Sequence, residues 1–260
     1  MTQERVIVSA DVYLALSTYA LATEKEETLA MLMGSTTADG VTVTVTHCLF
    51  CQRKDKRRDR VEISSEQLSQ AISHADATGT AVVGWAHSHP HITVLPSHVD
   101  LRCQRDQQML SDAFVGVIVS VFNDFKGVQR VQVIAFRSLN DGGELRRIEV
   151  PIFIQPCSGI KRESLQQLLR IPQIFLQEEK EFFTKACTQS RSGVGDGAVA
   201  AASDAREDRI VTSHYSGVYV RNLTSVLDKL CVPMVQAFVE RHERNMAEIE
   251  ALKERLKVLG

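Results

Sequence analysis

The stretch from Trp85 to Asp100 constrains this chain more than any other part of its sequence. It follows the apolar run 81–84, which is typical of a short buried strand. His87 and His89 are two residues apart at the end of that run, so an extended backbone directs both imidazoles to the same side. Two prolines restrict the loop that leads on to Asp100. The stretch therefore predicts a strand that brings two histidines close to a carboxylate.

Two imidazoles and one carboxylate are a ligand set typical of catalytic zinc. We predict that His87, His89 and Asp100 bind one Zn²⁺, which leaves the fourth tetrahedral position for water and so indicates hydrolysis. A second interpretation is purely structural, with Ser97 and Asp100 forming a helix capping box, Ser-x-x-Asp. The two roles are compatible, because the start of a helix determines where Asp100 and the Ser97 hydroxyl point.

Composition places the chain among globular proteins. Of its 260 residues, 44% are apolar and 24% are charged, and the formal net charge of -2 gives no sign of a nucleic-acid partner. The longest apolar run, 113–122, is about half of the ~20 residues that a membrane-spanning helix needs. The N-terminus lacks the apolar region of a signal peptide, and the six cysteines are scattered. We therefore expect a protein of the cytoplasm and nucleus, without a membrane partner.

Strand and helix patterns alternate along the first part of the chain, which predicts an α/β domain with a central mixed sheet flanked by helices. Strands are predicted over 4–9, 29–33, 41–46, 81–85, 114–122, 129–136 and 145–154. Helices are predicted over 10–22, after a Ser64–Gln67 capping box, and over 97–111.

The domain organisation is predicted in four segments. The α/β domain spans 1–158, and 159–188 forms two helical pieces with a break or kink at Pro172. Segment 189–212 is rich in Ser, Gly and Ala and predicts a flexible linker. Segment 213–260 is one long helix with an apolar stripe that consists of Leu223, Leu227, Leu230, Met234, Phe238, Met246, Ile249, Leu252 and Leu256. That stripe predicts a coiled-coil or bundle arm shared with a second chain, or a helix that packs back on its own domain.

The string from His87 to Asp100 reads His-Ser-His-Pro-x-x-Thr-x-x-Pro-Ser-x-x-Asp and resembles the JAMM motif of the MPN (Mov34/PAD1) family of metalloproteases. The resemblance implies an MPN fold and a zinc isopeptidase that removes ubiquitin or a ubiquitin-like modifier from a lysine side chain. A glutamate on an early strand completes the site in that family. We choose Glu27 as this general base and acid because it is nearest the apolar run, with Glu26 as the alternative. Ser97 is expected to stabilise the oxyanion.

Further strings, 23–27, 59–64 and 84–104, are most similar to the branch of this family that works in the BRISC and BRCA1-A assemblies. That likeness implies polyubiquitin as the substrate, with selectivity for chains linked through lysine sixty-three of ubiquitin. It also implies a catalytically silent MPN partner of the Abraxas family, paired in a heterodimer or a dimer of heterodimers. The leucine-rich tail agrees with such pairing independently.

A non-catalytic MPN scaffold is the main rival, and the intact ligand set argues against it. A zinc deaminase would need a Pro-Cys-x-x-Cys motif, which the sequence lacks. The pattern His47-Cys48-x-x-Cys51 could be half of a structural zinc site, but no second half accompanies it. The charged segment Arg53–Arg60 is expected to be a solvated loop.

Overall fold

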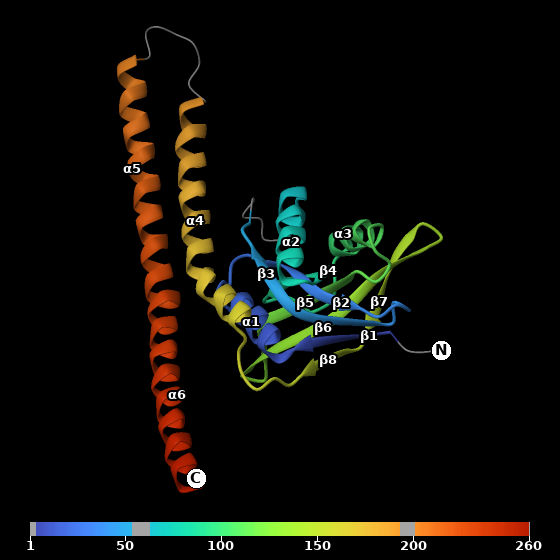
Figure 1. The fold of residues 1–260 in the computed structure, drawn as a ribbon. Coiled ribbons are helices and arrows are strands. Elements are labelled where there is room, and N and C mark those ends of the chain that lie inside the picture. Colours follow the sequence, from blue (N-terminus) through green and yellow to red (C-terminus); the bar gives the residue numbers. More distant parts are fainter. Residues whose placement is uncertain (1–3, 54–62, 193–200, 260) are drawn as a thin grey trace. The chain divides into compact units, whose positions relative to one another are not determined.

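The structure is a computed structural model that describes residues 4–53, 63–192 and 201–259. The chain divides into two compact units, Met1–Ile174 and Phe175–Gly260 (Figure 1). The first unit holds the sheet and the second is helical. The boundary between them lies inside a helix, later than the predicted domain end at residue 158.

A mixed eight-stranded sheet forms the first unit, in the order β7-β6-β5-β4-β2-β3-β1-β8. Its strands are β1 (Arg5–Ser9), β2 (Leu29–Thr36), β3 (Thr42–Cys51), β4 (Ala81–Pro90), β5 (Val115–Phe125), β6 (Val128–Asp141), β7 (Glu144–Val150) and β8 (Ile152–Gln155). Strand β4 lies inside the sheet, antiparallel to β2 and parallel to β5. The predicted α/β fold with a mixed sheet is therefore confirmed.

The predicted single strand over 145–154 is wrong, because the chain forms two strands there. Strand β7 pairs with β6 at one end of the strand order, and β8 pairs with β1 at the other end. Only Pro151 separates them, and it has no N–H to donate to a sheet. Its carbonyl oxygen accepts from the Val6 N–H at 2.8 Å. The two ends of the sheet therefore meet at Pro151, so the sheet is curled.

Helices α1 (Ala10–Leu21), α2 (Ser65–Thr78) and α3 (His98–Gln108) accompany the sheet in the first unit (Figure 1). The expected capping box starts α2, with reciprocal hydrogen bonds between Ser64 and Gln67. Helix α2 ends at Gly79, whose φ of 64° favours glycine. The core between helices and sheet includes large side chains such as Trp85 and Phe136, which are both fully buried.

Helix α4 (Arg162–Ser192) is one continuous helix that contains Pro172, so the structure shows no break there. Apolar residues around the proline are buried in the core, namely Leu168, Ile171, Ile174 and Phe175. Their burial compensates for the hydrogen bond that a proline removes from a helix interior. The start of α4 is held by buried Asp11, which accepts from the Lys161 N–H at 3.2 Å and from the Ser164 hydroxyl at 2.8 Å.

The second unit contains the rest of α4, helix α5 (Ala201–Val226), a π-helical turn (Leu227–Cys231) and helix α6 (Val232–Leu259). The Phe183 and Tyr219 rings stack at 5.0 Å, and the Asn222 amide donates to Glu179 at 2.8 Å. Helix α5 therefore packs back on α4. The π turn ends two residues before Pro233, whose missing N–H interrupts the regular bonding of the helix.

The structure also differs from the predicted linker over 189–212. Helix α4 continues to Ser192 and α5 begins at Ala201, so helix occupies both ends of that segment. Alanine has the highest helix propensity, and the alanines near residue 201 favour helix despite the small, polar composition. Residues 193–200 lie outside the described part of the chain, as do 54–60 of the charged segment. None of the described helices has the length and apolarity needed to cross a membrane.

Candidate metal centre

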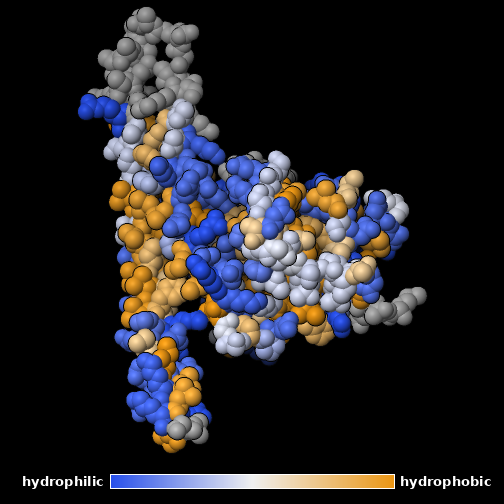
Figure 2. Space-filling view, in the orientation of Figure 1, coloured by the Kyte–Doolittle hydropathy of each residue, from blue (hydrophilic) through white to orange (hydrophobic). Residues whose placement is uncertain are grey.

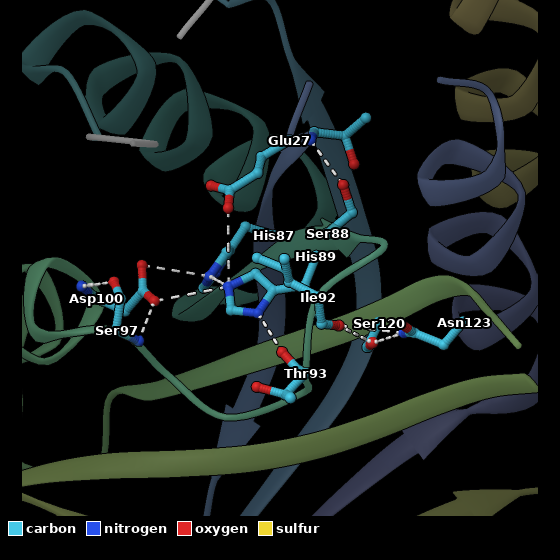
Figure 3. A network of polar contacts seen from close by, with 11 residues as sticks. Glu27, His87, Ser88, His89, Ile92, Thr93, Ser97, Asp100, Ser120 and Asn123 are labelled. Atoms are coloured by element: carbon cyan, nitrogen blue, oxygen red, sulfur yellow. Dashed lines mark hydrogen bonds and ion pairs between the residues drawn. The ribbon is translucent and has the colours of Figure 1, made fainter. Parts of the chain in front are cut away.

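Strand β4, an inner strand of the sheet, brings the two histidines together near its C-terminal end. The His87 and His89 side chains are almost completely buried, and their Nε2 atoms lie 3.1 Å apart (Figure 3). Their position is set by pairing on both sides, because His87 lies opposite Leu29 of β2 and Ile118 of β5. The alternation expected of a strand therefore directs both imidazoles to one place.

The third predicted ligand comes from the first turn of α3. Asp100 is buried, with Oδ1 lying 3.4 Å from His87 Nε2 and Oδ2 lying 3.6 Å from His89 Nε2. The Ser97 N–H donates to Asp100 Oδ2 at 2.6 Å, and the Asp100 N–H donates to Ser97 Oγ at 3.2 Å. The capping box therefore exists together with the ligand cluster. It orients the Asp100 carboxylate and leaves the Ser97 hydroxyl hydrogen able to donate.

The arrangement of these three residues fits a divalent metal ion. Their ligand atoms lie within 4.8 Å of one another, and no other such group of three occurs among the described residues. Ligand atoms bound about 2.1 Å from a tetrahedral zinc lie roughly 3.4 Å from one another. The two imidazole nitrogens, 3.1 Å apart, and the His87 Nε2 to Asp100 Oδ1 pair, 3.4 Å apart, come close to that spacing. The other carboxylate oxygen, Oδ2, lies 3.6 Å from His89 Nε2. The centre therefore suits one small cation held by two nitrogens and one oxygen.

Neighbouring groups orient the two imidazoles. His89 Nδ1 lies 2.7 Å from the Thr93 carbonyl oxygen, which can only accept, so Nδ1 carries the proton and Nε2 offers its lone pair to the centre (Figure 3). The His87 ring stacks on Trp85 at 4.5 Å. The Trp85 indole N–H in turn donates to Gln104 of α3 at 2.8 Å. These contacts leave each Nε2 facing its partner ligands.

The electrostatics of the centre favour positive charge. Although burial opposes ionisation, the nearby His87 charge and hydrogen bonds from His87, His89 and Ser97 hold the pKa of Asp100 far below its usual range. Burial also opposes the charging of His89, but Asp100, the Thr93 carbonyl and Glu27 together raise its pKa. The shift of His89 arises from two carboxylates and a carbonyl directed at its ring. The same groups would attract a metal cation.

Glu27 lies at the edge of this cluster, two residues before the start of β2. Its carboxylate is buried, with Oε1 lying 3.8 Å from His89 Nε2. Ser88 points away from the ligands and holds Thr28, the residue after Glu27, in place. The Thr28 N–H donates to Ser88 Oγ at 2.8 Å, and the Ser88 N–H donates to the Thr28 carbonyl at 3.1 Å. Glu26 forms an ion pair with Arg53 instead. The structure therefore places Glu27, and not Glu26, beside the ligands.

The other candidate ligands in the sequence lie elsewhere. His91 and His98 are exposed, and His91 pairs with Glu24 at 3.6 Å. Cys48 and Cys51 are buried in the core, where burial raises the pKa of each thiol to about 12. Neutral thiols in an apolar core are poor metal ligands. The pattern of His47, Cys48 and Cys51 therefore reflects strand packing.

The sequence motif did not reveal the groups that orient the ligands. The Thr93 carbonyl is a backbone group without a side-chain signature, and Gln104 lies four residues beyond the motif on α3. Only the three-dimensional structure brings Gln104 to Trp85. The motif specifies ligands by their spacing, whereas their supports are residues of many kinds.

Comparison with known proteins gives two family matches and a set of curated relatives. Residues 1–113 match the family described as JAB1/Mov34/MPN/PAD-1 ubiquitin protease, and residues 164–259 match the BRCC36 C-terminal helical domain. A Xenopus tropicalis protein is 35% identical over 277 residues that cover 100% of both chains. A Mus musculus protein is 32% identical, covering 95% of this chain and 91% of its own. A Camponotus floridanus protein is also 32% identical, with 98% and 95% covered. All three are named lysine-63-specific deubiquitinase BRCC36.

Proposed function

Because this chain belongs to the JAB1/Mov34/MPN/PAD-1 ubiquitin protease family, we propose that it is a zinc-dependent deubiquitinase that hydrolyses lysine-63-linked ubiquitin chains. The observation that carries this proposal is the buried cluster of His87, His89 and Asp100 with Glu27 at its edge. A scaffold subunit has no use for these four groups, and burying them without a function is costly. The end-to-end alignment with deubiquitinases supports the same activity.

The residues of the site supply distinct parts of the chemistry. His87, His89 and Asp100 would hold the metal. Zinc, when bound, acts as a Lewis acid and makes water a usable nucleophile near neutral pH. Glu27 accepts the proton of the attacking water and returns it to the departing lysine amine, which leaves poorly without a proton. Ser97 donates its hydroxyl to the developing oxyanion, a contribution worth about 2.7–4 kcal/mol in comparable sites.

A panel of differently linked diubiquitins tests the proposed activity. We expect the zinc-loaded chain, assembled with a catalytically silent MPN partner of the Abraxas family, to cleave the lysine-63-linked form in preference to the others. Treatment with a chelator should abolish cleavage, and added zinc should restore it, because these side chains bind the metal reversibly. Equal cleavage of every linkage would contradict the selectivity. No cleavage by the zinc-loaded complex would contradict the enzymatic function itself.

The surface of α6 supports the proposed partner. Figure 2 shows apolar residues gathered along the helical unit. The exposed ones on α6 include Val232, Val235, Val239, Met246, Ile249 and Leu256. They recur three, four or seven residues apart, which is the spacing of a coiled-coil seam. Met234 and Phe238 of the predicted stripe are instead half-buried. We propose that the exposed seam pairs with a helix of the silent MPN partner.

Introducing negative charge on this seam tests the pairing. We expect the Met246→Glu/Ile249→Glu protein to remain folded, because both side chains are already about half exposed, yet to lose its partner. When the variant is mixed with the partner, light scattering should then give the masses of the two separate chains and not the mass of their complex. The matched control is Ala247→Glu/Ala251→Glu, which adds the same charge to exposed positions outside the seam. A complex of unchanged mass with the seam variant, or an equal loss with the control, would contradict the interface.

A further inference from the structure

Strand β5 contains a bulge beside the metal centre. Its register against β6 shifts between Ser120, which lies opposite Gln132, and Asn123, which lies opposite Arg130. Two residues of β5 therefore face one residue of β6, and Phe122 takes a φ of 60°. Residues three apart on a regular strand point to opposite faces. The extra residue of the bulge allows the side chains of Ser120 and Asn123 to converge.

Both side chains converge on one carbonyl of the loop that follows β4. The Ser120 hydroxyl donates to the Ile92 carbonyl oxygen at 2.7 Å, and the Asn123 amide donates to the same oxygen at 3.1 Å (Figure 3). The Asn123 amide also contacts Ser120 Oγ. Ser120 is completely buried, so its hydroxyl cannot exchange this partner for bulk water. The two donors therefore fix the Ile92 carbonyl firmly.

The preceding residue of the loop is held to the same bulge. The His91 N–H donates to the Val121 carbonyl at 2.9 Å, and the His91 ring stacks on Phe122 at 5.4 Å. His91 and Phe122 both have positive φ values, 61° and 60°, which are unfavourable for residues with a side chain. Such backbone conformations persist only where the surroundings enforce them, often at functional sites. The loop and the bulge thus form one interlocked unit.

The interlocked loop and bulge lead directly to the Thr93 carbonyl, which orients the ligand His89. The peptide plane after the Ile92 carbonyl contains the Thr93 nitrogen, and the Thr93 carbonyl accepts from His89 Nδ1 at 2.7 Å. We propose that Ser120 and Asn123 are positioning residues of the metal centre: by fixing the Ile92 carbonyl they place the Thr93 carbonyl, which keeps His89 Nε2 directed at the metal. This inference rests on the metal centre of the proposed function. It extends the site to a strand outside the motif.

Metal affinity tests this role without reference to activity. We expect the full-length Ser120→Ala/Asn123→Ala protein to bind Zn²⁺ about 10–100-fold more weakly, the usual effect of removing groups that orient metal ligands. Competition with a chromogenic chelator measures the affinity, and thermal unfolding without metal measures the fold. The matched control is Ser138→Ala on β6, a buried serine whose hydroxyl has no hydrogen-bond partner among the described residues. The control should bind zinc as the unaltered protein does.

Two further variants keep the result interpretable. Asn123→Ala alone changes a half-buried residue and should fold even if the double variant does not, with a smaller loss of affinity. Ser120→Thr keeps the hydroxyl donor and should retain zinc affinity. Unchanged affinity in both alanine variants, or an equal loss in Ser138→Ala, would overturn the positioning role. A protein that binds zinc with these expected differences but cleaves no diubiquitin would contradict the proposed function alone.

Discussion

The Glu27→Gln protein is expected to retain its fold and its zinc and to lose nearly all isopeptidase activity. Glutamine has the size of glutamate and keeps a carbonyl oxygen near His89, but it cannot take a proton from water. A positioned general acid and base contributes about 10²–10⁴-fold to the rate. We therefore expect kcat/KM for lysine-63-linked diubiquitin to fall by about that factor, while zinc content stays at that of the unaltered protein.

Glu26→Gln is the matched control for this experiment. Glu26 is the adjacent residue and carries the same charge, but it forms an ion pair with Arg53 and not with the ligands. Its substitution should leave cleavage close to that of the unaltered protein. Full activity of the Glu27→Gln protein would contradict the proposed mechanism. Loss of activity only in the Glu26→Gln protein would show that Glu26, and not Glu27, is the general base.

The second large effect concerns the metal ligands. We expect the Asp100→Asn protein to be purified with little zinc and to be inactive, because an amide oxygen binds a cation far less strongly than a carboxylate. The asparagine oxygen can still accept from the Ser97 N–H, so the cap of α3 is retained and the fold should survive. Elemental analysis of the purified protein measures the zinc, and thermal unfolding measures the fold.

His98→Gln is the corresponding control, since His98 lies in the same stretch but is exposed at the start of α3. It should retain both zinc and activity. A zinc content in the Asp100→Asn protein equal to that of the unaltered protein would remove Asp100 from the ligand set. Zinc loss in the His98→Gln protein would indicate a different set of ligands.

Much of the architecture was accessible from local patterns. Alternating apolar residues predicted most strands, and the capping boxes at Ser64 and Ser97 were visible as short polar spacings. These signals are local because helix periodicity, strand alternation and caps depend on residues only a few positions apart. Prediction was wrong over 145–154 and differed from the structure at the expected linker, and α4 shows no break at Pro172. Over 145–154, long-range strand pairing outweighed the local pattern. In the linker, the helix propensity of alanine outweighed the small, polar composition.

In the C-terminal helices, the predicted helical structure is correct, but the apolar face that stays exposed differs from the predicted stripe. Its apolar residues predicted a helical arm, and α5 and α6 are helical. The side chains that remain exposed on α6 nevertheless include Val235 and Val239, which the predicted stripe omitted. Which apolar face stays free depends on what the rest of the unit covers, and helical periodicity alone does not contain that information.

By itself, the sequence determined the type of chemistry at the site. The spacing of His87, His89 and Asp100 already specifies a three-ligand metal centre, because one strand and one helix start suffice to position them. The tertiary structure decided which groups support that centre. Pairing of β2 with β4 selects Glu27, and the bulge in β5 brings Ser120 and Asn123 to the loop. Such convergence depends on strand register between distant segments, which no local pattern encodes.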